Sequence, residues 1–153
     1  MKKKYFTIII TFLILTSLSC ESYQKKYSDP IKCTQLKTWN GLTTFNGKKF
    51  SGSCYVYQIF EEQDKKTDLK SFRKGVPQGK YEKFYYPSEK LDWEGYRKNG
   101  HIHGPYRKYH KNSNLAVSGK LRKGFYIGTW LYFNENGELV DEKKYGFGGK
   151  EIN

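Results

Sequence analysis

Two glycine-lysine segments in this chain of 153 residues have residue types that could bind a phosphate group. Segment 75–81, Gly-Val-Pro-Gln-Gly-Lys-Tyr, has three residues between its glycines where a phosphate-binding loop has four. It also ends in Tyr, where that loop needs a hydroxyl that binds magnesium. Segment 146–150 lacks both the glycine spacing and the following helix of a dinucleotide site. We therefore expect both segments to be turns, without a nucleotide cofactor.

The three histidines, His101, His103 and His110, fall within ten residues of one another. A His-x-His pair on a strand would place both imidazoles on one face, where a metal could bind. No carboxylate or cysteine lies beside them in the sequence, and segment 99–104 has the composition of a turn. Solvated turn histidines are the preferred interpretation, with no metal site. Since the chain also lacks a Gly-x-Ser-x-Gly elbow, it is not expected to be an enzyme.

The first 19 residues have the pattern of an export signal, because three lysines precede 14 uncharged, mostly apolar residues and the small Ser19. A permanent membrane span would need about 20 apolar residues. Residues 16–20, Thr-Ser-Leu-Ser-Cys, resemble the bacterial lipobox. This resemblance implies that residues 1–19 are removed as a lipoprotein signal peptide and that Cys20 carries the acyl chains, such as palmitate. Cleavage without lipidation is the alternative.

If Cys20 is lipidated, Cys33 and Cys54 remain as one pair in an oxidising compartment. An even remainder suggests a disulfide, and a bridge that closes a loop of about 20 residues would contribute roughly 3 kcal/mol. Two buried free thiols are the alternative. The bridge would fasten the tether and cap segment, residues 20–49, to the start of the domain that follows.

The composition is basic and rich in rings. Lys and Arg number 28 against 15 Asp and Glu, and loss of three signal-peptide lysines lowers the formal net charge from +13 to +10. With 10 Phe, 3 Trp and 14 Tyr but only 37% hydrophobic residues, rings must supply most of the buried surface. This composition excludes disorder and a multidomain enzyme. The charge favours anionic surfaces, although nucleic acid is not expected to meet an exported, tethered protein.

From residue 50 the chain repeats a glycine followed by rings at positions +2 and +5. The three clear copies are 79–84, 104–109 and 128–133, and a degenerate copy lies at 52–57. Each unit closes on a glycine turn, which in the first three follows a basic pair. Within a unit, residues 80–86 and 91–98 read as strands around a turn at 87–90, and residues 129–133 and 139–145 do so around 134–137. The pattern predicts a series of β-hairpins joined by glycine turns.

Residues 50–148 resemble the MORN repeat in its bacterial variant form, with units near 52, 79, 104 and 128. The resemblance implies an all-β fold, in which consecutive hairpins form one elongated, twisted antiparallel sheet that is rolled into an open groove. In the first unit Cys54 replaces the first ring, and residues 61–66 are expected to enlarge the turn. Eight strands at about 4.8 Å would extend on the order of 35 Å. Residues 149–153 are expected to be a short tail.

The rings at position +2, Tyr81, Tyr106 and Trp130, are expected to be packing residues, while an exposed aromatic groove is the alternative. The recurrent basic pairs would align Lys74, Lys98 and Lys123 along one rim of the sheet. Such a ladder could contact an anionic surface, with about 1 kcal/mol for each charge near a membrane. The alternative is that these lysines only prevent aggregation between sheet edges.

These observations predict a non-catalytic binding or scaffold module, lipid-anchored to a bacterial membrane of the cell envelope. The expected location of the anchor is the periplasmic or surface face of an outer membrane. Its partner would be an unknown protein or an anionic lipid. The MORN resemblance also permits an antitoxin-like, partner-binding role, and a cell-envelope hydrolase is the remaining alternative.

Overall fold

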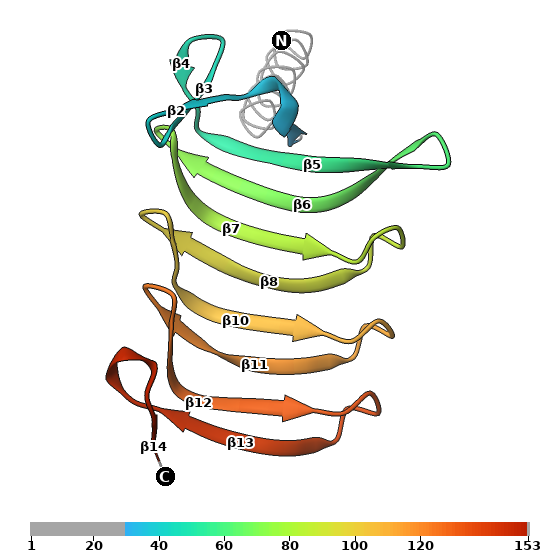
Figure 1. The fold of residues 1–153 in the computed structure, drawn as a ribbon, viewed down its shortest axis with the longest axis vertical. Coiled ribbons are helices and arrows are strands. Elements are labelled where there is room, and N and C mark those ends of the chain that lie inside the picture. Colours follow the sequence, from blue (N-terminus) through green and yellow to red (C-terminus); the bar gives the residue numbers. More distant parts are fainter. Residues whose placement is uncertain (1–29, 153) are drawn as a thin grey trace, which may run out of the picture.

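A computed structural model describes residues 30–152 and shows an all-β protein (Figure 1). The proposed signal peptide and Cys20 lie outside the described residues. Eight long strands form the body of the sheet, and each is antiparallel to the next one in this series. They are β5 (Gly52–Phe60), β6 (Gln63–Arg73), β7 (Val76–Phe84), β8 (Leu91–Lys98), β10 (Gly104–Tyr109), β11 (Leu115–Arg122), β12 (Phe125–Phe133) and β13 (Leu139–Tyr145).

Short elements complete this fold. Strand β1 (Ile31–Lys32) pairs with β5, β9 (His101–Ile102) with β8, and β14 (Glu151–Ile152) with β13. A separate three-stranded sheet, here called the cap, consists of β2 (Lys37–Trp39), β3 (Leu42–Phe45) and β4 (Lys48–Lys49). The 3-10 segments are η1 (Cys33–Gln35) and η2 (Phe147–Gly149). The prediction of one purely antiparallel sheet is therefore wrong at the N-terminal end, because β1 runs parallel to β5 and the cap pairs separately.

The two ends of the strands form two different sides of the molecule (Figure 1). On the junction side, two-residue turns join one repeat to the next at 74–75, 99–100 and 123–124. Both residues of each turn have positive φ, as in the type I′ turn that matches strand twist. On the hairpin side, the turns within repeats lie at 61–62, 85–90, 110–114 and 134–138. The junction side is on the left of Figure 1 and the hairpin side is on the right.

The first hairpin differs from the sequence prediction. An enlarged turn over 61–66 is wrong, because Glu61 and Glu62 alone form the turn, with φ of 47° and 63°. Residues 63–66 instead pair with 57–60 inside the ladder. Since a two-residue turn with positive φ continues the strand twist, the strands lengthen and this hairpin projects beyond the others (Figure 1).

The repeat glycines mark the point where each outgoing strand leaves the junction turn and enters the body of the sheet. Gly79, Gly104 and Gly128 have φ of 108°, 88° and 66°, a region that favours glycine.

A column of stacked rings crosses the repeats on one face of the sheet. Ring centroids are 4.9 Å apart for Tyr81 and Trp93, 5.5 Å for Trp93 and Tyr106, and 5.6 Å for Tyr106 and Trp130. Trp130 is fully buried and Tyr81 is buried, whereas Tyr106 is half-buried. Burial also raises the pKa of Tyr106 to about 12. The assignment of these rings to packing is confirmed for Tyr81 and Trp130.

One ring of the column, Trp130, needs a glycine on the preceding strand. A Cβ added to Gly119 would lie 2.3 Å from the Trp130 ring, so only glycine leaves room for this indole. At Gly95 the nearest atom of Tyr106 would be 3.8 Å from an added Cβ, which is ordinary contact. Trp130 is therefore fixed by both its own burial and the missing side chain of Gly119.

Candidate contact surface on the junction side

Backbone hydrogen bonds hold the junction turns together. The glycine N–H of each turn donates to a carbonyl of the preceding junction: Gly75 to Phe50 (2.7 Å), Gly100 to Pro77 (3.0 Å) and Gly124 to Ile102 (2.9 Å). These bonds use no side chain, so they leave the turn side chains free. Lys74, Lys98 and Lys123 are all exposed.

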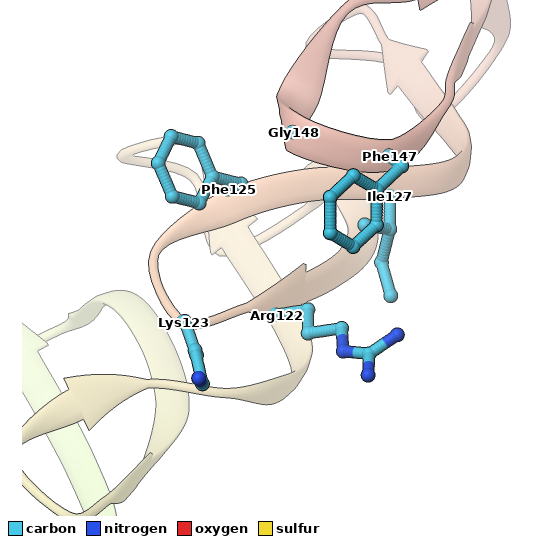
Figure 2. A pocket seen from close by; sticks show the side chains of 6 residues that line it. All are labelled: Arg122, Lys123, Phe125, Ile127, Phe147 and Gly148. Carbon is cyan, nitrogen blue, oxygen red and sulfur yellow. The ribbon is translucent and has the colours of Figure 1, made fainter.

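Near the last of these turns, six residues line a hollow of about 200 Å³ (Figure 2). They are Arg122, Lys123, Phe125, Ile127, Phe147 and Gly148. Phe125 and Ile127 share one face of β12 because side chains alternate along a strand. Segment η2 brings Phe147 to the same place. The two rings are unusually open to solvent, since Phe125 is 57% exposed and Phe147 is 89% exposed.

Neighbouring hollows extend this surface along the junction side. Lys98, His101 and His103 line one that also includes Arg122 and Lys123, and Lys120 lines another together with Arg122 and Ile127. No lining residue of the three hollows is an Asp or Glu. We call this surface the basic-aromatic patch. It is defined by Lys98, Lys120, Arg122, Lys123, Phe125 and Phe147.

The cations of the patch differ from those near Glu94 on the same face of the sheet. Glu94 lies 3.5 Å from the Lys80 ammonium and 3.4 Å from the Arg107 guanidinium, and it accepts a hydrogen bond from the Tyr109 hydroxyl at 3.0 Å. Partial burial acts to raise the pKa of Glu94, but Tyr109 and Lys80 together hold it below its usual value. Within residues 30–152 no such ion pair involves the cations of the patch. Their charge remains available to an external anion.

The three lysines predicted as a ladder do not occupy equivalent positions. Lys74 and Lys123 are the first turn residues, with φ of 51° and 52°, but Asn99 has this role in the second junction. Lys98 is instead the last residue of β8, because this junction has one more residue, Arg-Lys-Asn-Gly, than the others. Lys98 and Lys123 still line one hollow. Lys74 is not among its lining residues, and its N–H donates to the Ser51 hydroxyl at 2.8 Å.

Sequence reasoning noted Arg122 only as half of a recurrent basic pair, and it missed Lys120, Phe125 and Phe147 as surface residues. One signal could have indicated Lys120, because segment 120–130 contains Lys and Arg but no Asp or Glu. Phe147 gave no signal, since its position depends on how η2 turns back towards β12.

The histidines do not form one cluster, because His101 is on the junction side and His110 is on the hairpin side. The sequence predicted that His101 lies in a turn. This prediction is wrong, because His101 pairs with Lys98 in the short ladder between β8 and β9. His110 is on the hairpin side, where its Nε2 lies 2.9 Å from the Phe133 carbonyl oxygen. Among the described residues, no group of three or more His, Cys, Asp or Glu side chains is placed to hold a metal ion.

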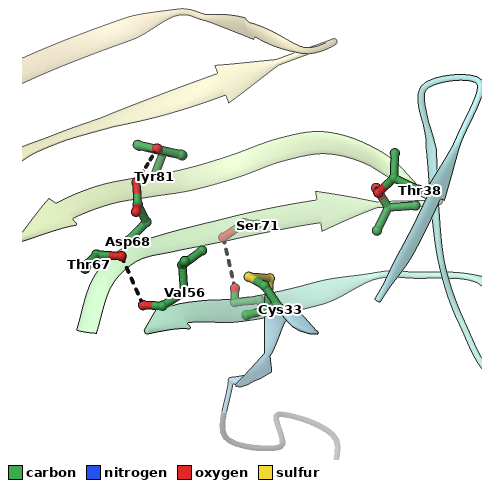
Figure 3. Close-up of a disulfide and its surroundings, with 10 residues drawn as sticks. Cys33, Thr38, Val56, Thr67, Asp68, Ser71 and Tyr81 are labelled. Carbon is green, nitrogen blue, oxygen red and sulfur yellow. Dashed lines mark hydrogen bonds between the residues drawn. A yellow bond between two sulfur atoms is a disulfide. The ribbon is translucent and has the colours of Figure 1, made fainter. Parts of the chain in front are cut away.

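Cys33 and Cys54 lie within bonding distance, with sulfur atoms 2.06 Å apart and Cα atoms 5.0 Å apart (Figure 3). Cys54 is fully buried and occupies the position that Tyr81, Tyr106 and Trp130 have in the later repeats. This pair joins η1 to β5, so it fastens the N-terminal segment to the first repeat where ring stacking is absent.

The patch combines positive charge with exposed rings, which suits a partner that presents anionic groups beside apolar ones. Two of its hollows measure about 200 Å³, and the one that Lys120, Arg122 and Ile127 line measures about 550 Å³, within the roughly 300–1,000 Å³ of typical small-molecule sites. All three are open to solvent and lie side by side, so the geometry is better suited to contact with an extended surface than to enclosure of a ligand.

No helix within residues 30–152 has the length and apolar character needed to cross a membrane. Comparisons of the chain with protein families, curated proteins and solved structures found no match.

Proposed function

We propose that the mature protein is a lipoprotein with MORN-like repeats, held to a membrane of the bacterial cell envelope through Cys20. It acts as a non-catalytic binding or scaffold module. The basic-aromatic patch carries this proposal, because it presents cations that form no ion pair within residues 30–152 beside the exposed rings of Phe125 and Phe147.

The repeat architecture supports the MORN-like part of the proposal. Glycine kinks recur at Gly79, Gly104 and Gly128, and each is followed two residues later by a ring of the stacked column. Successive hairpins pair in chain order along one long sheet. A protein built this way exposes a long side that can hold a partner or a surface without an enclosed active site.

The anchor follows from the N-terminal pattern. Each buried CH₂ of an acyl chain contributes about 0.8 kcal/mol, so a single chain binds marginally and several chains bind firmly. We expect Cys20→Ser to move the protein from the membrane fraction to the soluble fraction and to abolish labelling by a palmitate analogue.

A matched control is the double variant Cys33→Ala with Cys54→Ala, which removes two other cysteines and keeps Cys20. It should remain labelled and bound to membranes. If the Cys20→Ser protein still labels and still partitions with membranes, the lipid anchor is wrong.

A further inference from the structure

We infer that the whole junction side lies against the anionic leaflet that holds the Cys20 lipid. Trp39 would enter the headgroup region at one end, and Phe125 and Phe147 would enter it at the other. This inference rests on the proposed lipid anchor and adds an orientation of the sheet and a second contact site, the cap.

The cap presents a large ring to solvent. Trp39 is 81% exposed at the end of β2, beside the turn at Asn40 and Gly41. Lys37, Lys48 and Lys49, from β2 and β4, are exposed as well. Tryptophan with neighbouring lysines is typical of protein segments at a membrane-water interface, where the ring has an apolar body and a polar N–H.

Hydrogen bonds fix the cap to the junction side rather than to the hairpin side (Figure 1). The Thr43 N–H donates to the Gly75 carbonyl at 2.8 Å, and the Phe50 N–H donates to the Thr43 carbonyl at 3.0 Å. Thr43 is only 3% exposed, so this connection is buried. The cap that carries Trp39 therefore belongs to the same side of the sheet as the basic-aromatic patch.

The charges of the two sides are opposite in sign. The cap and junction segments 37–50, 73–80, 96–105 and 120–130 contain no Asp or Glu. The hairpin side has more carboxylates than lysines. Its carboxylates are Glu61, Glu62, Asp64, Glu89, Glu135 and Glu138, and its lysines are Lys65, Lys66, Lys90 and Lys111. An anionic leaflet attracts the first side and repels the second, which orients the sheet.

The length of the tether is compatible with this orientation. Residues 21–29, between Cys20 and the first described residue, span at most roughly 30 Å when extended. Strand spacing of about 4.8 Å places β12 roughly 29 Å from β5. A sheet that lies with its junction side along the membrane can thus keep the lipid, Trp39 and the patch in the same leaflet.

Fluorescence of the lipidated protein tests this contact directly. Trp130 is fully buried and Trp93 is half-buried, so Trp39 is the tryptophan most open to quenchers. In vesicles of phosphatidylglycerol with brominated acyl chains, we expect strong quenching of the wild type and a loss of at least half of this quenching in Trp39→Phe. Equal quenching in both proteins would overturn the inference.

Charge reversal tests the orientation with the same readout. Lys74→Glu, Lys98→Glu and Lys123→Glu together should remove most of the quenching of Trp39. The matched control, Lys65→Glu, Lys83→Glu and Lys111→Glu, makes the same change of six charge units away from the junction side and should keep it. Equal losses would mean that net charge alone matters and that no side is preferred.

The wild type provides a test that needs no variant. Raising the salt from 0.01 M to 1 M shortens the screening length from about 30 Å to about 3 Å and should lower the quenching of Trp39 several-fold. A protein that carries the acyl label but shows no quenching in any of these vesicles overturns the inference and leaves the anchor intact. That result would favour an acidic protein partner. An unlabelled Cys20 would instead contradict the proposed function.

Discussion

The junction side and the hairpin side of the sheet differ in the hydrogen bonds that link the turns of neighbouring repeats. Junction turns use backbone N–H groups, as in the bonds from Gly100 to Pro77 and from Gly124 to Ile102. Hairpin turns use side chains that reach the backbone of a neighbouring repeat. These bonds run from the Tyr86 hydroxyl to Ile59 O (2.6 Å), from the Tyr85 hydroxyl to Tyr109 O (2.7 Å), and from the Asn112 and Asn114 amides to Glu135 O (2.8 and 2.7 Å).

This difference determines which side chains are free for another purpose. A backbone bond does not depend on the side chain of its residue, so the side chains of Lys74 and Lys123 can point to solvent without breaking it. A tyrosine or asparagine on the hairpin side is already used when the sheet forms. The side of the sheet that is available for binding is therefore the one whose turns are bonded to the neighbouring repeat mainly through backbone groups.

The largest expected effect comes from the ring column, which lies between the two sides. Trp130→Ala should lower the free energy of unfolding by about 3–5 kcal/mol, since it removes a fully buried indole. Trp39→Ala, at a position 81% exposed, should change it by less than about 0.5 kcal/mol. Chemical denaturation measures both. If amide exchange in Trp130→Ala becomes faster on only one side, the two sides unfold as independent units and are not two sides of one cooperative sheet.

The disulfide should matter for the junction side more than for the hairpin side. Cys33→Ala with Cys54→Ala should cost about 3 kcal/mol, because the closed loop has about 20 residues. Amide exchange should quicken within residues 37–50, which the bridge helps to hold, and stay slow in the strands next to the turn at 134–138. Two free thiols in protein isolated from cells, or uniform loosening, would contradict this prediction.

Two junction glycines should respond differently to the same change. An added Cβ at Gly75 would lie 2.8 Å from the Thr43 carbonyl oxygen, whereas at Gly100 nothing lies within 4 Å. Their φ values are 82° and 81°, so both variants share the backbone penalty of about 1 kcal/mol. Thermal unfolding should therefore show a larger loss for Gly75→Ala than for Gly100→Ala. Equal losses would mean that the cap is not fixed to the junction side.

The smallest effect concerns one side-chain hydrogen bond of the hairpin side. Tyr85→Phe removes the hydroxyl that donates to Tyr109 O and should cost about 1 kcal/mol. Tyr96→Phe, at a ring 48% exposed, is the control and should be nearly neutral. Both are measured by urea unfolding at pH 7. If Tyr85→Phe leaves the free energy of unfolding unchanged, side-chain hydrogen bonds do not stabilise this side.

The same residue gives a pH dependence. Burial, followed by the charge of Asp92, raises the pKa of Tyr85 above its ordinary value. The neutral hydroxyl is thus favoured by folding, and its contribution is complete below the unfolded pKa of about 10 and lost as pH rises through the folded value. The stability difference between wild type and Tyr85→Phe should shrink above pH 10.

Local residue chemistry was enough to predict most of the strand arrangement. The recurrence of glycine with rings at +2 and +5 located the hairpins, because ring stacking and positive φ each require particular residue types at fixed offsets. Residue types also predicted the pairing of Cys33 with Cys54, a prediction still to be tested in the isolated protein. The same reasoning failed at 61–66, where charged residues resembled a loop but continue the ladder after a two-residue turn.

The amino-acid sequence by itself determined the repeat period, the packing role of Tyr81 and Trp130, and the absence of carboxylates from the junction segments. These are local properties of residue type and spacing. Only the tertiary structure decided that Asn99, and not Lys98, is equivalent to Lys74, because one extra residue shifts the phase of that junction. It also decided that Phe147 and Phe125 line one hollow, since bringing together residues 22 positions apart depends on the path of η2 in space.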